Sequence, residues 1–270
     1  MLEALQFPFM QHALIAGVLV AVIAGIVGSL VVVNRMVFLS GGIAHASYGG
    51  IGLAVYFSIP VFLGASLFAV ASALLIAYLT MYRRERIDTL IGVLWAVGMA
   101  IGIVFTDMTP GYRTDLMSYL FGSILAVERA DLYFAGALLA FIVLLVLFRY
   151  RAILAVSYDS EYAELQGIPA RRCYTIILVV AALSVVVAIK IVGLILVIAL
   201  LTVPVYIAEH FSASLRQMML VASIFGTLFT LAGLWVSYAY DITSGAAIIL
   251  VSAAGMVAVS LITRAMRRAS

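Results

Sequence analysis

Apolar runs of about 20 residues recur along the whole chain, and this feature restricts the fold more than any other. The runs are continuous and lack the alternation of a membrane β-barrel, so each predicts a spanning helix. Hydrophobic residues make up 66% of the 270 residues and charged residues only 10%, too apolar a balance for a water-soluble domain. We expect an all-α transmembrane bundle of eight or nine helices, over about residues 10–33, 38–59, 61–82, 90–106, 131–148, 173–190, 191–208, 218–238 and 243–263.

The basic residues predict how this bundle is oriented. With nine crossings, all but three of the 15 Lys and Arg residues fall on one side, the exceptions being Arg113, Arg129 and Lys190. Because basic connections favour the cytoplasmic side, we expect the N-terminus outside and the C-terminus in the cytoplasm. The N-terminal run lacks the basic start and cleavage pattern of a signal peptide, so we expect it to be retained.

The stretch from Asn34 to Gly52, NRMVFLSGGIAHASYGGIG, places one ionisable side chain, His45, in an otherwise apolar or small-residue run. On a helix, the residues three, four and seven positions from His45 are mostly glycine, with Phe38 and Tyr48. An ionisable residue inside a membrane helix indicates a functional site, and a glycine face indicates a path or a tight helix contact. Two interpretations of His45 stay open: a structural histidine bonded across a helix interface, or contact with a transition metal.

Two long connections interrupt the runs. The inner one, SYDSEYAELQGIPARR over residues 157–172, predicts a short helix that is capped by Asp159 or Ser160 and runs through Leu165. Gly167 would end it, and Pro169 follows where a helix cannot continue. A capped cytosolic helix between two spans has no lipid to pack on, so we expect a soluble partner. The outer connection, over residues 106–131, predicts an interfacial or re-entrant helix.

Pro204 lies inside the run KIVGLILVIALLTVPVYIA, where it removes one backbone hydrogen bond and predicts a kink. The kink would be either a hinge for movement or a static bend. No P-loop, GxSxG or HExxH motif occurs in the sequence, so ATP hydrolysis would require another chain, and the chain itself is not expected to be an enzyme. The single cysteine, Cys173, excludes an intramolecular disulfide.

Several separated stretches resemble the membrane permease subunit of zinc/manganese-type ABC uptake transporters. They occur in colinear order over about residues 19–258 and are VVVNRMVFLSGGIAHASYGGIGLA from Val31, SYLFGSILAVERADL from Ser118, YDSEYAELQGIPARR from Tyr158, and the Pro204 run from Lys190. The resemblance implies a single permease domain over residues 1–270 in a prokaryotic cytoplasmic membrane. It also implies a homodimer, a cytosolic ABC ATPase that carries the ATP, and an extracytoplasmic metal-binding protein.

The resemblance further assigns residues to roles. Residues 157–172 would be the cytosolic coupling segment, with contacts to the ATPase from Asp159, Glu161, Glu164, Leu165, Gly167 and Arg171. The metal pathway would be lined by His45, Tyr48, Gly41, Gly42 and Gly49. In such a transporter the kink that Pro204 itself predicts would serve as the hinge. The family usually has an aspartate four residues before the histidine, where this chain has Gly41. A lone imidazole would hold a divalent ion weakly, which suits a conduit that must release it.

The transported ion would be Zn²⁺, Mn²⁺ or Fe²⁺, with no cofactor bound by the chain itself. An alternative is a permease for a chelated metal or cofactor of the siderophore or cobalamin type, whose chains usually have an extra span. A membrane enzyme ranks lower because the runs offer only His45 at depth, plus hydroxyl groups with no base beside them. A structural assembly factor and a secondary transporter rank lower too, the latter because it would place more charges at the midplane.

Overall fold

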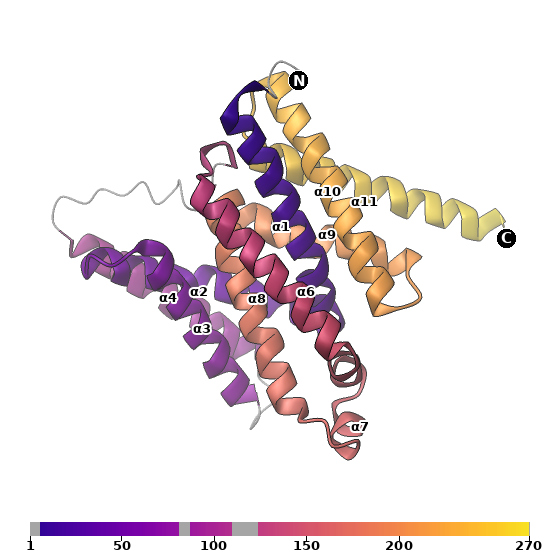
Figure 1. The fold of residues 1–270 in the computed structure, drawn as a ribbon, viewed down its shortest axis with the longest axis horizontal. Coiled ribbons are helices and arrows are strands. Elements are labelled where there is room, and N and C mark those ends of the chain that lie inside the picture. Colours follow the sequence, from indigo (N-terminus) through magenta and orange to yellow (C-terminus); the bar gives the residue numbers. More distant parts are fainter. Residues whose placement is uncertain (1–5, 81–86, 110–123, 270) are drawn as a thin grey trace. The chain divides into compact units, whose positions relative to one another are not determined.

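The computed structural model of the chain describes residues 6–80, 87–109 and 124–269, and within these ranges the regular elements are all helices (Figure 1). They are α1 (Pro8–Val33), α2 (Val37–Tyr56), α3 (Val61–Thr80), α4 (Ile87–Asp107), the short 3-10 helix η3 (Ile124–Ala126), α6 (Arg129–Tyr158), α7 (Ser160–Leu165), α8 (Ala170–Val192), α9 (Leu194–Phe211), α10 (Leu215–Tyr240) and α11 (Ser244–Ala269).

Each apolar run of the sequence forms one long helix at the predicted place. The largest difference is α6, which was predicted to end near residue 148 and instead continues to Tyr158. Arg149 and Arg151 follow directly after the apolar run, but arginine tolerates a helix interior and its long stem can carry the charge away from the apolar region. The predicted interfacial helix of residues 106–131 falls mainly on 110–123, which lie outside the described residues.

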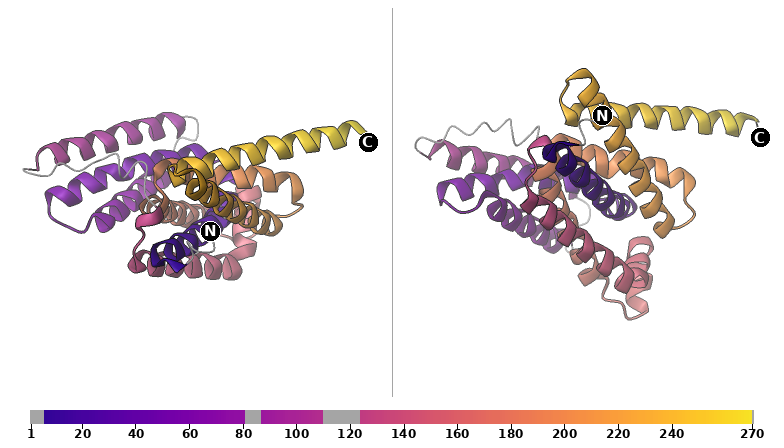
Figure 2. Two further views of the ribbon diagram at one scale, coloured as in Figure 1. Left: turned by 90° about the horizontal axis from the view of Figure 1, so that it is seen from above. Right: turned by 45° about the horizontal axis from the view of Figure 1, so that its top comes forward.

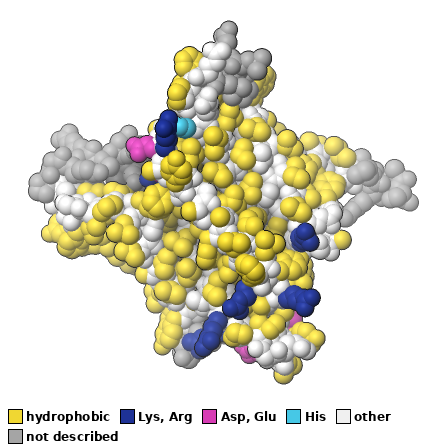
Figure 3. Space-filling model, in the orientation of Figure 1, with side chains coloured by type: hydrophobic (Ala, Val, Ile, Leu, Met, Phe, Trp, Pro, Cys, Tyr) yellow, Lys and Arg dark blue, Asp and Glu magenta, His cyan; other side chains and the backbone are white. Residues whose placement is uncertain are grey.

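Eight of the described helices are long and apolar enough to cross a membrane: α1, α3, α4, α6, α8, α9, α10 and α11. The ninth long helix, α2, spans 20 residues, but it contains five glycines and His45 and is not among these eight. Hydrophobic side chains also cover most of the face drawn in Figure 3, and several Lys and Arg side chains gather at the end where α7 lies in Figure 1. These features establish a polytopic all-α membrane protein.

The chain divides into two compact units, which are described separately below. The first unit consists of residues 1–29, 120–139 and 191–270, and the second of residues 30–119 and 140–190. Because α1, α6 and α8 contribute residues to both units, the division does not decide whether residues 1–270 form one permease domain. That assignment stays a prediction.

In the second unit α2 packs against α3 and α4, and the three helices lie side by side in both views (Figures 1 and 2). Residues pair in the same order along α2 and α4: Gly42 meets Ile91, and further along Gly52 meets Gly102. The two helices therefore run parallel. In the sequence, α3 connects the end of α2 to the start of α4. In the first unit α9, α10 and α11 pack together, and Pro204 of α9 lies against Gly226 of α10.

Most hydroxyl groups within the helices donate to a carbonyl one turn earlier in the same helix. Examples are Ser29 to Gly25, Thr106 to Gly102, Ser184 to Val180 and Thr230 to Gly226, at 2.7–2.8 Å. Such bonds satisfy polar groups where water is scarce, so they are compatible with a membrane interior and need no ligand. The polar groups that are not satisfied in this way are the informative ones.

Candidate functional site

His45 lies in the middle of α2, partly buried, and its ring faces the indole of Trp95 on α4. The two ring centroids are 3.9 Å apart and the planes differ by 11°, a parallel stack. The buried Nδ1 atom of His45 has no hydrogen-bond partner among the described residues. A buried nitrogen without a partner is costly, by about 1–3 kcal/mol, and such groups often mark a functional position.

Trp95 is itself held in place from two sides. Its Nε1–H donates to the Sδ atom of Met99, one turn further along α4, at 3.1 Å. Phe38, one of the residues that share the helix face of His45, lies with its ring 6.5 Å from the indole. The imidazole is therefore oriented by an aromatic contact rather than by a hydrogen bond.

Two of the glycines predicted to line the pathway, Gly42 and Gly49, lie at helix contacts within the second unit. A methyl group added at Gly42 would collide with Ile91, and one added at Gly49 would lie 2.8 Å from the carbonyl oxygen of Gly98. Tyr48 is buried, and Gly102 packs directly against it. Of the two interpretations of the glycine face, a tight helix contact is realised at Gly42 and Gly49. A role of His45, Tyr48, Gly41, Gly42 or Gly49 in a metal pathway stays a prediction.

No group of three or more His, Cys, Asp and Glu side chains that could hold a metal ion occurs within the described ranges 6–80, 87–109 and 124–269. The position one turn before His45 is Gly41, which has no carboxylate. Among the described residues, His45 also belongs to no group of three or more metal-ligating side chains. What it offers chemically is a single imidazole nitrogen, which can contact a borderline divalent ion briefly but not store it.

The predicted short helix of the inner connection is present as α7, and its cap is the predicted residue. Asp159 Oδ1 accepts hydrogen bonds from the backbone N–H groups of Glu161 and Tyr162, at 3.0 and 2.9 Å. After the helix, Gly167 adopts a φ of 76°, a left-handed conformation that suits glycine and reverses the chain. Local chemistry in the sequence accounts for both ends of α7.

One buried residue anchors α7, while the rest of the helix is open. Ala163 is 0% exposed and packs with Val156, Ala170 and Cys173, which joins α7 to the end of α6 and the start of α8. Leu165, by contrast, is 85% exposed. A contact of this open helix with another protein stays a prediction.

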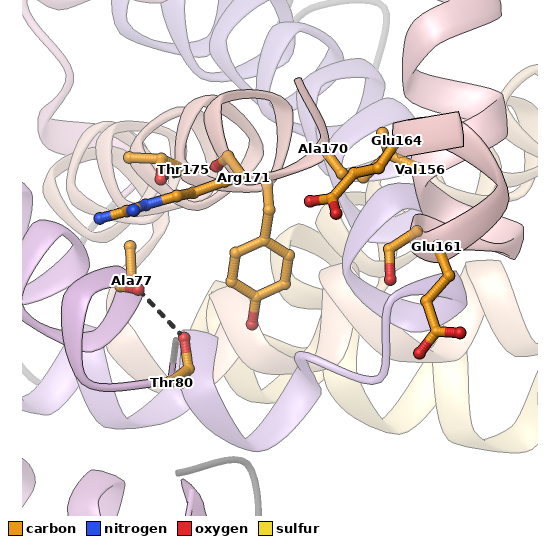
Figure 4. Close-up of a pocket in the computed structure, with 10 residues that line it drawn as sticks. Ala77, Thr80, Val156, Glu161, Glu164, Ala170, Arg171 and Thr175 are labelled. Atoms are coloured by element: carbon orange, nitrogen blue, oxygen red, sulfur yellow. Dashed lines mark hydrogen bonds between the residues drawn. The ribbon is translucent and has the colours of Figure 1, made fainter. Parts of the chain in front are cut away.

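A cavity of about 460 Å³ lies beside α7 in the second unit (Figure 4). Figure 4 shows Glu161 and Glu164 on one side of it and Arg171 with Thr175 on the other, above Ala77 and Thr80 of α3. The lining residues are Ala77, Thr80, Val156, Ser160, Glu161, Glu164, Ala170, Arg171, Tyr174 and Thr175. Three of the residues predicted to couple to an ATPase therefore border one hollow that carries both signs of charge.

Two residues near these sites were not singled out in the sequence. Trp95 was missed because it is 50 positions from His45, and only the parallel register of α2 and α4 brings them together. Asn34 was quoted only as the start of a motif, yet its Nδ2 donates to the Ser157 hydroxyl at 3.0 Å and to the Leu30 carbonyl at 2.8 Å. A useful signal for Trp95 was its rarity, since the chain has only two tryptophans.

Taken together, the apolar helices, the small-residue contacts and the capped helix between two long helices define a polytopic all-α membrane protein. The ABC 3 transport family matches residues 6–263, nearly the whole chain. The chain therefore belongs to that family and is a transporter subunit rather than an enzyme. The resemblance inferred from its motifs is confirmed.

Related proteins are similar in sequence to this chain over most of their length. An uncharacterized membrane protein of Synechocystis sp. is 46% identical, covering 93% of this chain and 90% of its own. The manganese transport system membrane protein MntC of Halalkalibacterium halodurans is 33% identical, covering 93% of this chain and 86% of its own.

Solved structures extend the comparison to the fold. PsaBC from Streptococcus pneumoniae, in complex with Fab, has a TM-score of 0.85 and is 30% identical, over 96% of this chain and 93% of its own. A second solved chain, described as a metal-chelate type ABC transporter, reaches a TM-score of 0.73 at 17% identity and shares the fold alone. The all-α permease architecture is therefore confirmed.

Proposed function

We propose that the chain is the permease subunit of an ATP-driven importer that moves a divalent transition metal ion across the cytoplasmic membrane. The observation that carries this proposal is similarity over more than nine-tenths of the chain to a permease named for manganese transport. The ion is Zn²⁺, Mn²⁺ or Fe²⁺, because a neutral imidazole on a conduit accepts several divalent ions of this series. The C-terminus lies in the cytoplasm, as the distribution of basic residues predicts.

Its partners follow from the same proposal. A cytosolic ABC ATPase contacts α7 through the segment from Asp159 to Arg171, where Leu165 offers an exposed apolar tip and Glu161 and Glu164 offer charge. ATP is bound and hydrolysed on that separate chain. A second copy of this chain completes the permease, and an extracytoplasmic binding protein delivers the ion. Support comes from the capped and anchored geometry of α7, which keeps a small helix folded while most of its surface is open.

The transport pathway passes His45, with Tyr48 and the glycines Gly41, Gly42 and Gly49 on the same helix. The close packing of Gly42 and Gly49 against neighbouring helices holds α2 near α4, so that His45 and Trp95 meet. Pro204 serves as a hinge in α9, since a proline leaves one backbone carbonyl without its helical partner.

Reconstitution into proteoliposomes with the ATPase tests the function directly. We expect uptake of radioactive zinc, manganese or iron that requires ATP and stops when the ATPase is inactivated. Excess free metal should compete, whereas a siderophore or cobalamin should not. Uptake that competes only with the chelate would replace the proposal by the chelate alternative, and uptake driven by an ion gradient alone would remove the ATPase from it.

The His45 assignment needs a separate variant. His45→Ala should strongly reduce uptake while the protein still assembles with its ATPase, because no group of three or more His, Cys, Asp and Glu side chains that could bind the ion instead occurs among the described residues. The unaffected variant for comparison is His210→Ala, since His210 is exposed at the end of α9 and its Nδ1 lies 2.9 Å from the carbonyl of Tyr206. Wild-type uptake of all three metals by His45→Ala would refute the site and leave the import function standing.

A further inference from the structure

The contact between His45 and Trp95 has a geometry that bears on how an ion would be bound. A metal ion binds imidazole in the plane of the ring, through a nitrogen lone pair, whereas the indole covers the face of the ring. The stack at 3.9 Å therefore limits rotation of the imidazole without occupying the direction from which an ion approaches.

Metal-binding histidines are normally oriented by a hydrogen bond from the second ring nitrogen to a carboxylate or a carbonyl. In this chain the buried Nδ1 atom has no such partner among the described residues, and Gly41 supplies no carboxylate one turn away. The contact that does fix the ring is the indole, which is held in turn by its hydrogen bond to Met99 and by the ring of Phe38.

We propose that Trp95 is the positioning residue for His45: its indole holds the imidazole in the orientation that presents a ring nitrogen to the transported ion, in place of a hydrogen-bonding carboxylate. This inference rests on the proposed role of His45 in metal transport. A stacked orienting group adds no negative charge, so the ion is held by one neutral nitrogen and is released readily. Trp95 acts through His45 and does not itself bind the metal.

Substitutions that separate positioning from packing provide the first test. Trp95→Phe keeps an aromatic face, whereas Trp95→Leu fills part of the space without one. In proteoliposomes with the ATPase, Trp95→Leu should raise KM for Zn²⁺ by about three- to tenfold, the scale of one aromatic pair, and leave Vmax unchanged. Trp95→Phe should stay near wild type. The matched control, Trp235→Leu, replaces a 53% exposed tryptophan of α10 and should change neither quantity.

A purely structural role gives a different pattern. Loss of aromatic packing alone would lower the yield, the melting temperature and Vmax of Trp95→Leu together, with KM unchanged, and that pattern would refute positioning. Equal KM values in Trp95→Leu and wild type would refute it too. A wild-type protein that takes up no metal at all would instead contradict the proposed function.

Fluorescence tests whether an ion binds the imidazole that Trp95 stacks on, even if transport fails or Trp95→Leu does not fold. The chain has two tryptophans, so Trp235→Phe leaves Trp95 as the only one in the purified full chain. With Ni²⁺ alone as the probe, binding to the stacked imidazole should quench Trp95 emission in a saturable way. His45→Ala in the same background should abolish the saturable part. Equal quenching with and without His45, or no saturable quenching in either, would overturn the proposal.

Discussion

Replacing Asp159 by alanine should unwind α7 while leaving the membrane helices folded. The carboxylate accepts two of the backbone N–H groups that the first turn of the helix leaves unpaired, at 3.0 and 2.9 Å. Loss of such a cap costs about 0.5–2 kcal/mol. A six-residue helix cannot persist on propensity, so the cap and the buried Ala163 together hold it. A loss of about 1 kcal/mol lowers the folded-to-unfolded ratio of α7 roughly fivefold.

Hydrogen–deuterium exchange of the full chain in nanodiscs measures this change. Amides of residues 160–168 should exchange about fivefold faster in Asp159→Ala, and amides of α10 should not change. Asp159→Asn is the matched control, because asparagine caps a helix as well as aspartate but carries no charge. ATP-dependent uptake should fall in the alanine variant and persist in the asparagine variant.

Two results would contradict the role of the Asp159 cap. Equal exchange in Asp159→Ala and wild type would mean that the packing of Ala163 holds α7 without its cap. If Asp159→Asn slowed uptake as much as Asp159→Ala while exchange stayed normal, the charge of Asp159, and not the helix that it caps, would be what the ATPase requires.

Three further outcomes are expected. Gly52→Ala should lower the melting temperature in detergent, by overpacking of about 1–3 kcal/mol, because the added methyl group meets the α4 backbone; Gly92→Ala, with open space around it, should be neutral. Ser157→Ala should destabilise the second unit by about 1 kcal/mol, and Asn34→Leu by more, because it also removes the bond to the Leu30 carbonyl; the double variant should lose no more than Asn34→Leu alone. Pro204→Ala should raise the melting temperature and lower Vmax of uptake if the kink is a hinge; unchanged Vmax would make it a static bend.

The sequence predicted α7 closely because the signals at its ends are local. A carboxylate at the start, a glycine with positive φ after the end and a following proline each act within a few residues. Apolar run length likewise predicted the long helices, since a membrane interior requires each span to satisfy its own backbone. The predicted end of α6, near residue 148, was wrong because it was taken from the end of the apolar run. Arginine ends an apolar run, but a helix can continue through it.

The surroundings of His45 could not be predicted in the same way. Helical periodicity placed glycines on the face of His45, but whether a neighbour or a solute fills the space beside them depends on the register of α2 against α4. Trp95 reaches His45 only because Gly42, Gly49 and Gly52 let the two parallel helices approach closely. A single sequence shows the small residues that permit this contact. It does not show which residues of α2 lie against which residues of α4.

The close packing of α2 on α4 also determines which events can change the fluorescence emission of Trp95. At Gly52 and Gly102 the two backbones approach without an intervening side chain, so the helices cannot slide or separate by small amounts without steric overlap. They should therefore move as one body if α7 transmits a displacement, through the Asn34 to Ser157 bond, to the start of α2. His45 lies about 12 Å along α2 from the start of that helix at Val37, and the stack would be carried along intact. Emission of Trp95 should consequently respond to an ion at His45 but not to ATP alone, and a response to ATP without metal would show that α2 and α4 separate.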